Sequence, residues 1–150
     1  MKKCMCILLA MLLVLSLGGC GTPNYEDTNG ETNFSLQYIT DVDIIQGINT
    51  FTMMSSTVSL NNTTTCKANT LSGVENLWKR NMKNGKLDMV VSCQITKGNA
   101  RLVLLIDDTI VHDFSLNEAN QHITMENVSG KVCLKLAGEN AGYTVSFTLQ

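Results

Sequence analysis

Three cysteines could act as nucleophiles, metal ligands or disulfide partners in the body of this chain. Cys66, Cys93 and Cys133 lie 27 and 40 residues apart, so they form no Cys-x-x-Cys chelate, and neither a zinc site nor any cofactor is predicted. Cys93 falls on an apolar face of its segment, as does Cys66 less clearly, whereas Cys133 alternates in phase with Lys131 and Lys135. We therefore expect two buried cysteines and one exposed thiol, and a single disulfide remains an alternative.

The histidines and paired acids give no recognisable catalytic or metal motif. His112 and His122 lack metal-ligand spacing, and His112 lies in phase with apolar neighbours, as a half-buried structural histidine would. Asp41 and Asp43, and the pair Asp107-Asp108, could offer carboxylates to calcium, but neither forms an alternating acidic loop. No HExxH, GxSxG or P-loop pattern occurs. We therefore expect no enzyme activity, with a surface hydrolase built from scattered residues as a weaker alternative.

Aromatic side chains, on which sugar-binding sites often depend, number only eight. Four lie in phase with apolar neighbours and are expected in the core: Phe51, Phe114, Tyr143 and Phe147. Three others could form a flat platform for a ligand: Trp78, Tyr25 and Tyr38. Trp78 is the candidate ligand-binding residue, because an indole offers the largest contact area. Burial of Trp78 in the core is the alternative.

The amino terminus carries a motif with a defined chemistry. Lys2 and Lys3 precede an apolar run of eleven residues, Ile7 to Leu17, which is too short to span a bilayer as a helix. The run ends in Leu17-Gly18-Gly19-Cys20, which resembles the lipobox of bacterial lipoproteins. In that family the cysteine thiol receives a diacylglyceryl group before a signal peptidase cuts in front of it. The resemblance implies that Cys20 is lipidated and anchors the protein at the extracytoplasmic face of the cell membrane.

These features divide the chain into three parts. Residues 1–19 are expected to be the signal peptide, and residues 20–33 the lipidated cysteine with a flexible, polar tether. Residues 34–150 are expected to be the folded domain. The chain has a formal charge of −2, which becomes −4 without Lys2 and Lys3, so no basic surface for nucleic acid is predicted.

Alternation of apolar and polar residues predicts strands through most of the folded part. Residues 131–136 and 143–150 alternate on either side of a glycine-bounded stretch and are expected to form a hairpin. Residues 87–95 form another strand, and residues 102–106 are apolar on both faces, as a central strand would be. Turns are expected at Asp107-Asp108 and Asn61-Asn62. About eight short strands at this spacing predict an all-β, antiparallel, jelly-roll-like β-sandwich.

Upstream segments give a weaker pattern. Residues 34–40, 50–60 and 63–71 are rich in residues that favour strands. Residues 72–82 fit a helix slightly better, because Ser72 and Glu75 could form a capping box. The pattern of the residues leaves strand and helix both open at this segment.

A wider resemblance extends over about residues 66–150. The sequences Leu71-Ser72-Gly73, Gly85-Lys86-Leu87, Gly98 to Leu104 and Gly130 to Phe147 follow an order similar to that of small uncharacterised lipoproteins of Gram-positive gut bacteria. The last of these stretches also resembles the closing hairpin of pre-peptidase C-terminal β-sandwiches, although Val132-Cys133 replaces the usual aromatic. The resemblance implies a strand over residues 72–82 and a C-terminal β-sandwich.

The expected function follows from the anchor and the absence of a catalytic motif. We expect a lipid-anchored cell-envelope protein that acts as a non-enzymatic binding module. Its expected partners are the membrane, through Cys20, and a surface glycan or an envelope protein. The alternatives are a carbohydrate-binding module or an accessory structural lipoprotein. The weakly charged, hydroxyl-bearing strand faces are candidate ligand surfaces: Thr144, Ser146 and Thr148 on one strand, and Ser92 and Gln94 on another.

Overall fold

The structure is a computed structural model that describes residues 36–150. The expected signal peptide (1–19), Cys20 with its tether (20–33), and Tyr25 lie outside the described residues. Among the described residues, no helix combines the length and the apolar character needed to cross a membrane.

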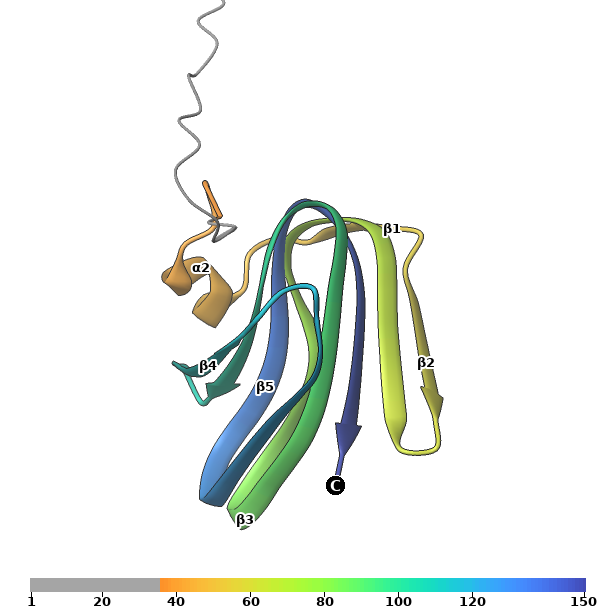
Figure 1. Cartoon of the computed structure of the whole chain (residues 1–150). Helices are drawn as coiled ribbons and strands as arrows, with labels where there is room; N and C mark the ends of the chain where they lie inside the picture. Colours follow the sequence, from red (N-terminus) through yellow and green to blue (C-terminus); the bar gives the residue numbers. More distant parts are fainter. Residues whose placement is uncertain (1–35) are drawn as a thin grey trace, which may run out of the picture. The chain divides into compact units, whose positions relative to one another are not determined.

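Strands dominate the described part of the chain (Figure 1). One short helix, α2 (Asp41–Gln46), is followed by five strands: β1 (Phe51–Met53), β2 (Ser56–Leu60), β3 (Thr63–Ile106), β4 (Thr109–Phe114) and β5 (Glu118–Leu149). Strands hold 78% of these residues and every strand pairing is antiparallel, so the domain is all-β, as predicted. Residues 72–82 are part of β3, which confirms the strand that the resemblance implied.

Five strands are present where about eight short ones were expected, because β3 and β5 are very long. β3 has 44 residues and β5 has 32. Both bend sharply without losing their strand partners, and Figure 1 shows them arching over at one end of the domain. Stretches that the sequence pattern separates by turns are therefore consecutive limbs of one strand.

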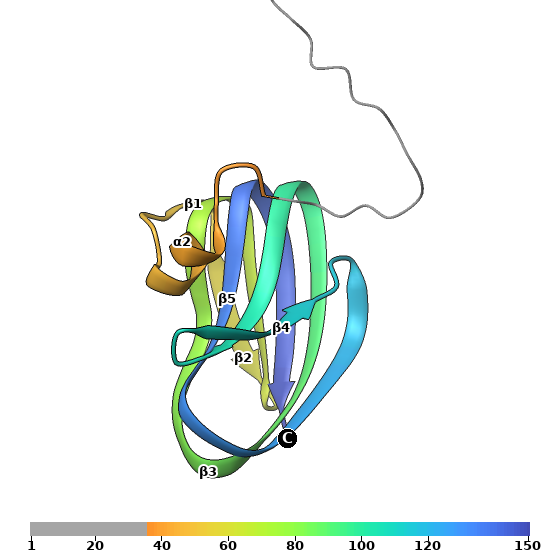
Figure 2. The same ribbon diagram turned by 90° about the vertical axis from the view of Figure 1, so that its left-hand side faces the viewer.

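The register shows how the two long strands accompany each other. β3 follows β5 in the antiparallel sense from the pair Thr63↔Thr148, through Met82↔Gly130, to Cys93↔Glu118. Residues 89–106 of β3 also pair with the other edge of the C-terminal part of β5, from Met89↔Leu149 to Ile106↔Val132, so residues 89–93 have β5 on both sides. The C-terminal part of β5, from residue 132 to residue 148, therefore lies between two limbs of β3 (Figure 2).

The predicted hairpin of residues 131–136 and 143–150 is wrong. These residues are two limbs of β5, and their partners are limbs of β3 rather than each other. The glycines between them allow a close crossing of chains: a Cβ on Gly138 would lie 3.1 Å from the side chain of Leu71, and one on Gly142 would lie 2.5 Å from Oγ1 of Thr96. The glycine signal marked a real change of direction, but a strand bend rather than a hairpin turn. The turns at Asn61-Asn62 and Asp107-Asp108 are confirmed.

Two hydrophobic clusters stabilise the domain. The main core lies between the limbs of the long strands and includes fully buried leucines such as Leu102, Leu104, Leu134 and Leu136. Burying each of these side chains contributes about 1.5–3 kcal/mol. The second cluster lies under α2 and consists of Ile39, Ile44, Val74, Val103, Leu105, Cys133 and Ala137. Residues 102–105 are buried throughout, because Leu102 and Leu104 belong to the first cluster and Val103 and Leu105 to the second.

Residues 36–40 precede α2 and are not a strand, contrary to the expectation for residues 34–40. A capping box begins α2 instead: Thr40 Oγ1 accepts from the Asp43 N–H at 3.3 Å, and an Asp43 carboxylate oxygen accepts from the Thr40 N–H at 2.9 Å. The Thr40 N–H and the Thr40 hydroxyl, which lies 2.7 Å from the Asp43 carboxylate, both donate to this carboxylate and lower the pKa of Asp43. The carboxylate that the sequence offered for calcium therefore serves the helix terminus.

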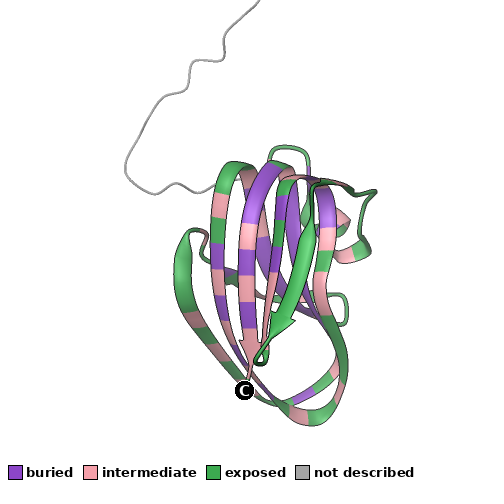
Figure 3. Cartoon of the chain, turned by 90° about the vertical axis from the view of Figure 1, so that its right-hand side faces the viewer, coloured by how far each residue is buried: buried purple, intermediate pink, exposed green. Residues whose placement is uncertain are grey.

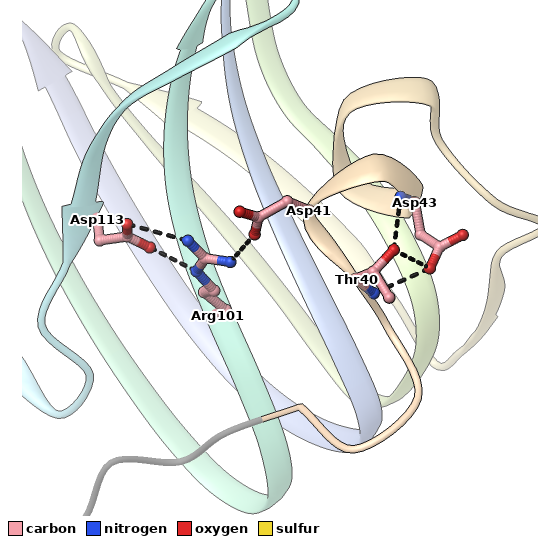
Figure 4. A network of polar contacts seen from close by, with 5 residues as sticks. All are labelled: Thr40, Asp41, Asp43, Arg101 and Asp113. Atoms are coloured by element: carbon pink, nitrogen blue, oxygen red, sulfur yellow. Dashed lines mark hydrogen bonds and ion pairs between the residues drawn. The ribbon is translucent and has the colours of Figure 1, made fainter.

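Polar contacts attach α2 to the strands (Figure 4). The Arg101 guanidinium donates to both carboxylate oxygens of Asp113, from Nε at 2.6 Å and from Nη2 at 3.1 Å, and its third nitrogen donates to Asp41. The hydrogen bonds to Asp113, and to a lesser extent the one to Asp41, raise the pKa of Arg101, whereas its partial burial lowers it. At the other end of α2, Lys135 Nζ donates to the backbone carbonyls of Ile44 and Ile45, each at 2.8 Å.

Candidate functional site on a hydroxyl-bearing sheet face

One face of the domain carries short polar side chains in rows. Residues 63–67 of β3, 144–148 of β5 and 90–94 of β3 lie side by side in register. Every second side chain on these segments points into the main core, and the others point away from it. The outward-pointing residues with hydroxyl or amide side chains define what we call the hydroxyl face: Thr63, Thr65, Thr144, Ser146, Thr148, Ser92 and Gln94. One charged residue, the exposed Lys67, lies in the same rows beside Thr144. Figure 3 shows the side of the molecule on which β2 and the C-terminal limb of β5 lie.

Hydrogen bonds hold the rows of this face in place. Ser146 lies between Thr65 and Ser92 in the register, and its Oγ is 2.9 Å from Thr65 Oγ1. In the next row, Thr63 Oγ1 is 2.8 Å from Thr148 Oγ1. A hydroxyl has one donor and two acceptor positions, so each of these pairs keeps free capacity for a ligand.

A depression of about 480 Å³ opens on the hydroxyl face. Its volume lies within the usual range for small-molecule sites. The lining is polar apart from one alanine and one cysteine, and it comprises Ser92, Cys93, Gln94, Asn117, Glu118, Ala119, Thr144 and Ser146. Glu118 supplies the only charge of this lining, so the site favours hydrogen bonding over ion pairing.

The loop between β4 and β5, together with the first residues of β5, forms one wall of the depression. Asn117 has a positive φ of 59°, and its side-chain oxygen accepts from the Ile95 N–H at 2.8 Å. The N–H of Asn120, whose φ is 57°, donates to Ser92 Oγ at 2.9 Å. Asparagine tolerates this left-handed backbone better than most residues. Glu118, the first residue of β5, therefore lies between two neighbours whose hydrogen bonds hold them in place.

The structure separates the candidate residues named from the sequence. It brings Ser92 beside Ser146 and Gln94 beside Thr144, which the sequence placed only on separate strands. Trp78 does not line the depression; it pairs with Leu134 and is half-buried against the main core. The other platform candidate among the described residues, Tyr38, has 77% of its surface exposed.

Of the aromatics expected in the core, three are buried there: Phe114, Tyr143 and Phe147. Phe51 is 59% exposed, contrary to expectation, because β1 pairs with the bend of β3 at Ser72 rather than covering the core.

All three described cysteines are free and buried. Burial raises the pKa of Cys66 and raises that of Cys93 to about 11, which disfavours the reactive thiolate. The expectation of an exposed thiol at Cys133 is wrong, since this residue is only 2% exposed. Its alternation with Lys131 and Lys135 correctly identified the outer face of the strand, but α2 covers that face.

The two histidines occupy different environments. His112 is half-buried, as expected, and its ring meets Phe114 edge-on with 4.7 Å between centroids. A bulge in the β3–β4 pairing lies between the pairs Leu104↔His112 and Leu105↔Ile110. The bulge places Ile110 against the second cluster while Phe114 enters the main core.

His122 is exposed, and its Nε2 lies 2.5 Å from Asp88 Oδ1. Hydrogen bonds from Lys86 first, and from His122 second, lower the pKa of Asp88 to about 2. Thr124 Oγ1 also approaches Nε2, at 3.4 Å. In a catalytic triad the acid binds one ring nitrogen and the nucleophile the other. Here both groups meet the same nitrogen, so this cluster does not have triad geometry.

Comparison with known proteins adds no family to this description. No protein-family model matches the chain, and no curated protein matches it. The described residues contain no group of three or more histidine, cysteine or acidic side chains arranged to hold a metal ion.

Proposed function

We propose that this chain is a lipid-anchored cell-envelope protein whose hydroxyl face binds a neutral, hydroxyl-rich ligand, namely a surface glycan. The observation that carries the proposal is the depression formed by Ser92, Gln94, Thr144 and Ser146 together with the loop at Asn117. Hydroxyl and amide groups can donate to and accept from sugar hydroxyls alike. The anchor at Cys20 rests on the lipobox resemblance.

The proposed site is a binding site rather than a catalytic one. The described cysteines are buried, and the His122 cluster lacks the arrangement of a triad. No aromatic side chain lines the depression, so hydrogen bonds have to supply most of the affinity. Because each such bond contributes only about 1 kcal/mol net, the expected binding is weak for a single sugar and stronger for an oligomer along the rows.

We further propose that the five strands form an antiparallel β-sandwich with jelly-roll order. The pairing supports it: limb 63–71 of β3 accompanies 141–148 of β5, limb 73–82 accompanies 130–138, and limb 85–93 accompanies 118–128. The end of β3 then pairs with β4, which closes the series as its fourth pair. One long ribbon bent in this way has the eight limbs of a jelly roll.

Removing polar groups from the depression should weaken glycan binding. The test uses a panel of neutral oligosaccharides (glucans, mannans and N-acetylglucosamine oligomers) and measures binding by titration. The double change Thr144→Val and Gln94→Leu keeps similar side-chain volume and should lower the affinity for any bound oligosaccharide by a factor of about 10 or more.

Thr109→Val is the matched control, because Thr109 is an exposed strand threonine on β4, outside the depression. It should leave the affinity unchanged. If no oligosaccharide binds, or if both variants lose affinity equally, the glycan proposal fails and an accessory structural role becomes the better account.

Replacing Cys20 with alanine should abolish lipid attachment. The full chain, produced in a bacterium that processes lipoproteins, should incorporate labelled palmitate, and Cys20→Ala should incorporate none. Cys6→Ala changes a thiol of the expected signal peptide and should incorporate label normally. Label retained by Cys20→Ala, or a mature terminus at another residue, would contradict the proposed anchor.

A further inference from the structure

Strand β2 has an open edge that lacks the usual protection. Its pairing partner is β3, and among the described residues no strand pairs with its other edge. All five of its residues are exposed, and Figure 3 shows it as the fully exposed arrow next to the C-terminus. An open strand edge offers unpaired N–H and C=O groups to another strand, so proteins ordinarily block such edges with charges, proline or bulges.

None of these devices is present at β2. Residues 44–66 contain neither a charged residue nor a proline, and the β2–β3 register is regular. Of the nine large apolar side chains that the described surface exposes, five lie within ten residues here: Phe51, Met53, Met54, Val58 and Leu60. The two β2 strands themselves would meet without charge repulsion, since the nearest charge, Lys67, lies on β3 beside Ser56.

The edge at β4 is a useful contrast within the same molecule. β4 also pairs only with β3 among the described residues, but its pairing contains a bulge. It carries His112 and Asp113, and Asp108 directly precedes it. One edge strand of this domain is therefore protected and the other is not, which indicates that the β2 edge is kept available for pairing.

The turn that follows β2 determines which backbone groups face the open edge. Asn61 and Asn62 both have positive φ (48° and 64°), as a two-residue type I′ turn requires. In such a hairpin Leu60 and Thr63, which flank the turn, exchange backbone hydrogen bonds with each other. Because hydrogen-bonded and non-hydrogen-bonded pairs alternate along an antiparallel ladder, the backbone groups of Val58 also point toward β3. Thr57 and Ser59 direct their N–H and C=O groups to the open edge.

We propose that β2 pairs antiparallel with β2 of a second copy of this chain, about a two-fold axis at Val58. Thr57 of each copy then bonds to Ser59 of the other, which satisfies the outward backbone groups of both strands. The two Val58 side chains lie opposite each other in the close, non-hydrogen-bonded position. Five residues bury little surface for a stable dimer, so the neighbouring apolar residues of β1 have to contribute, and the pair is weak in dilute solution.

This dimer would extend the hydroxyl face. Val58 is in register with Thr65 and Leu60 with Thr63, so the exposed valine and leucine continue the rows of that face toward the edge. A two-fold axis perpendicular to the sheet leaves both hydroxyl faces on the same side. The dimer rests on the edge geometry alone and does not depend on the ligand.

A cysteine at the axis tests the register directly. In the full chain, solubilised in mild detergent and gently oxidised, Val58→Cys should form a disulfide-linked dimer, because residues opposite each other at a non-hydrogen-bonded position have Cα atoms about 4.5 Å apart. Mass spectrometry should identify a linked peptide containing position 58 from each copy. Val111→Cys is the matched control, on the protected edge of β4, and should remain monomeric.

A charge at the axis tests the association without a covalent link. Val58→Lys places like charges opposite each other and should weaken dimer formation, measured by sedimentation of the full chain over a range of concentrations, by a factor of about 10 or more. Val111→Lys should not weaken it. Val58 is 61% exposed and Val111 is 38% exposed, so Val58→Lys and Val111→Lys should both leave the circular dichroism spectrum and Tm unaltered. A monomer at every concentration, or cross-linking of Val111→Cys as strong as that of Val58→Cys, would overturn the proposal.

Discussion

Replacing Gly98 with alanine should lower the free energy of unfolding by about 3 kcal/mol. Gly98 has a φ of +68°, a conformation that costs an alanine about 1–2 kcal/mol. An added Cβ would also lie 2.3 Å from the backbone oxygen of Asn140, where the bends of β3 and β5 cross. Backbone cannot rotate away as a side chain can, so one of the two strands has to shift, at a further cost of about 1–3 kcal/mol.

Gly47 provides the matched control for this effect. It has a φ of +78°, but a Cβ built on it meets nothing within 4 Å. Its ψ of 130° places it outside the left-handed helical region, in a strained conformation that costs about 1–3 kcal/mol, so Gly47→Ala should show this backbone cost without a clash. Chemical denaturation of both variants measures the difference. Equal losses would show that the close crossing at Gly98 adds nothing to the stability of the bend.

The crossing of strands at Gly98 also explains which part of the fold sequence patterns can predict. Alternation correctly identified strand residues at 87–95, 102–106, 131–136 and 143–149, because each of these segments has at least one face in a core. It did not identify residues 118–130, which form the first part of β5. A glycine-bounded change of direction looks the same in sequence whether it ends a hairpin or bends a continuous strand. The difference lies in the pairing of residues such as Thr63 and Thr148, which are far apart in the chain.

The candidate site was predictable to a similar extent. Alternation predicted hydroxyl-bearing outward faces at Ser92 and Ser146, but only the register places these two residues side by side. Thr63 and Thr65, which complete the rows, lay in a segment whose alternation was weak. Asn117 and Glu118 were missed, although the asparagines at 117 and 120 are a local signal for a positive-φ loop.

Burial of Cys133 could not be predicted from its strand. Its alternation with Lys131 and Lys135 correctly placed Cys133 on the face of the strand that points away from the main core. That face would be exposed to solvent if no other element covered it. The covering helix comes from residues 41–46, about ninety positions earlier, which carry their own local signal in the capping residues Thr40 and Asp43. A helix of six residues has little intrinsic stability, so its formation depends on contacts with the strands.

Lys135 is the contact on which the position of α2 depends most. Only 8% of Lys135 is exposed, and its ammonium group donates to the carbonyls of Ile44 and Ile45 in the last turn of the helix. Positive charge is favourable at a helix C-terminus, where carbonyl groups lack partners. Burial lowers the pKa of Lys135, so these bonds have to offset a cost of desolvation.

Lys135→Met should therefore lower the free energy of unfolding by about 2 kcal/mol, because methionine keeps the apolar stem but leaves both carbonyls without their donor. Loss of these bonds should also loosen α2 over Cys133. We expect alkylation of Cys133 by iodoacetamide to accelerate, while Cys93, which lies in the main core, keeps its rate and serves as the internal reference.

Lys67→Met separates this effect from the mere loss of a positive charge, because Lys67 lies exposed on β3 away from the helix. It should change the free energy of unfolding by no more than about 0.5 kcal/mol and leave both alkylation rates unaltered. If Lys135→Met lowered stability while Cys133 stayed as unreactive as before, the helix would be held by the apolar contacts of Ile39 and Ile44 instead. Faster alkylation of Cys133, with an unchanged rate for Cys93, would show that the hydrogen bonds from Lys135 to the C-terminal carbonyls hold α2 in place. An unchanged rate for Cys133 would show that the apolar contacts of the helix are sufficient.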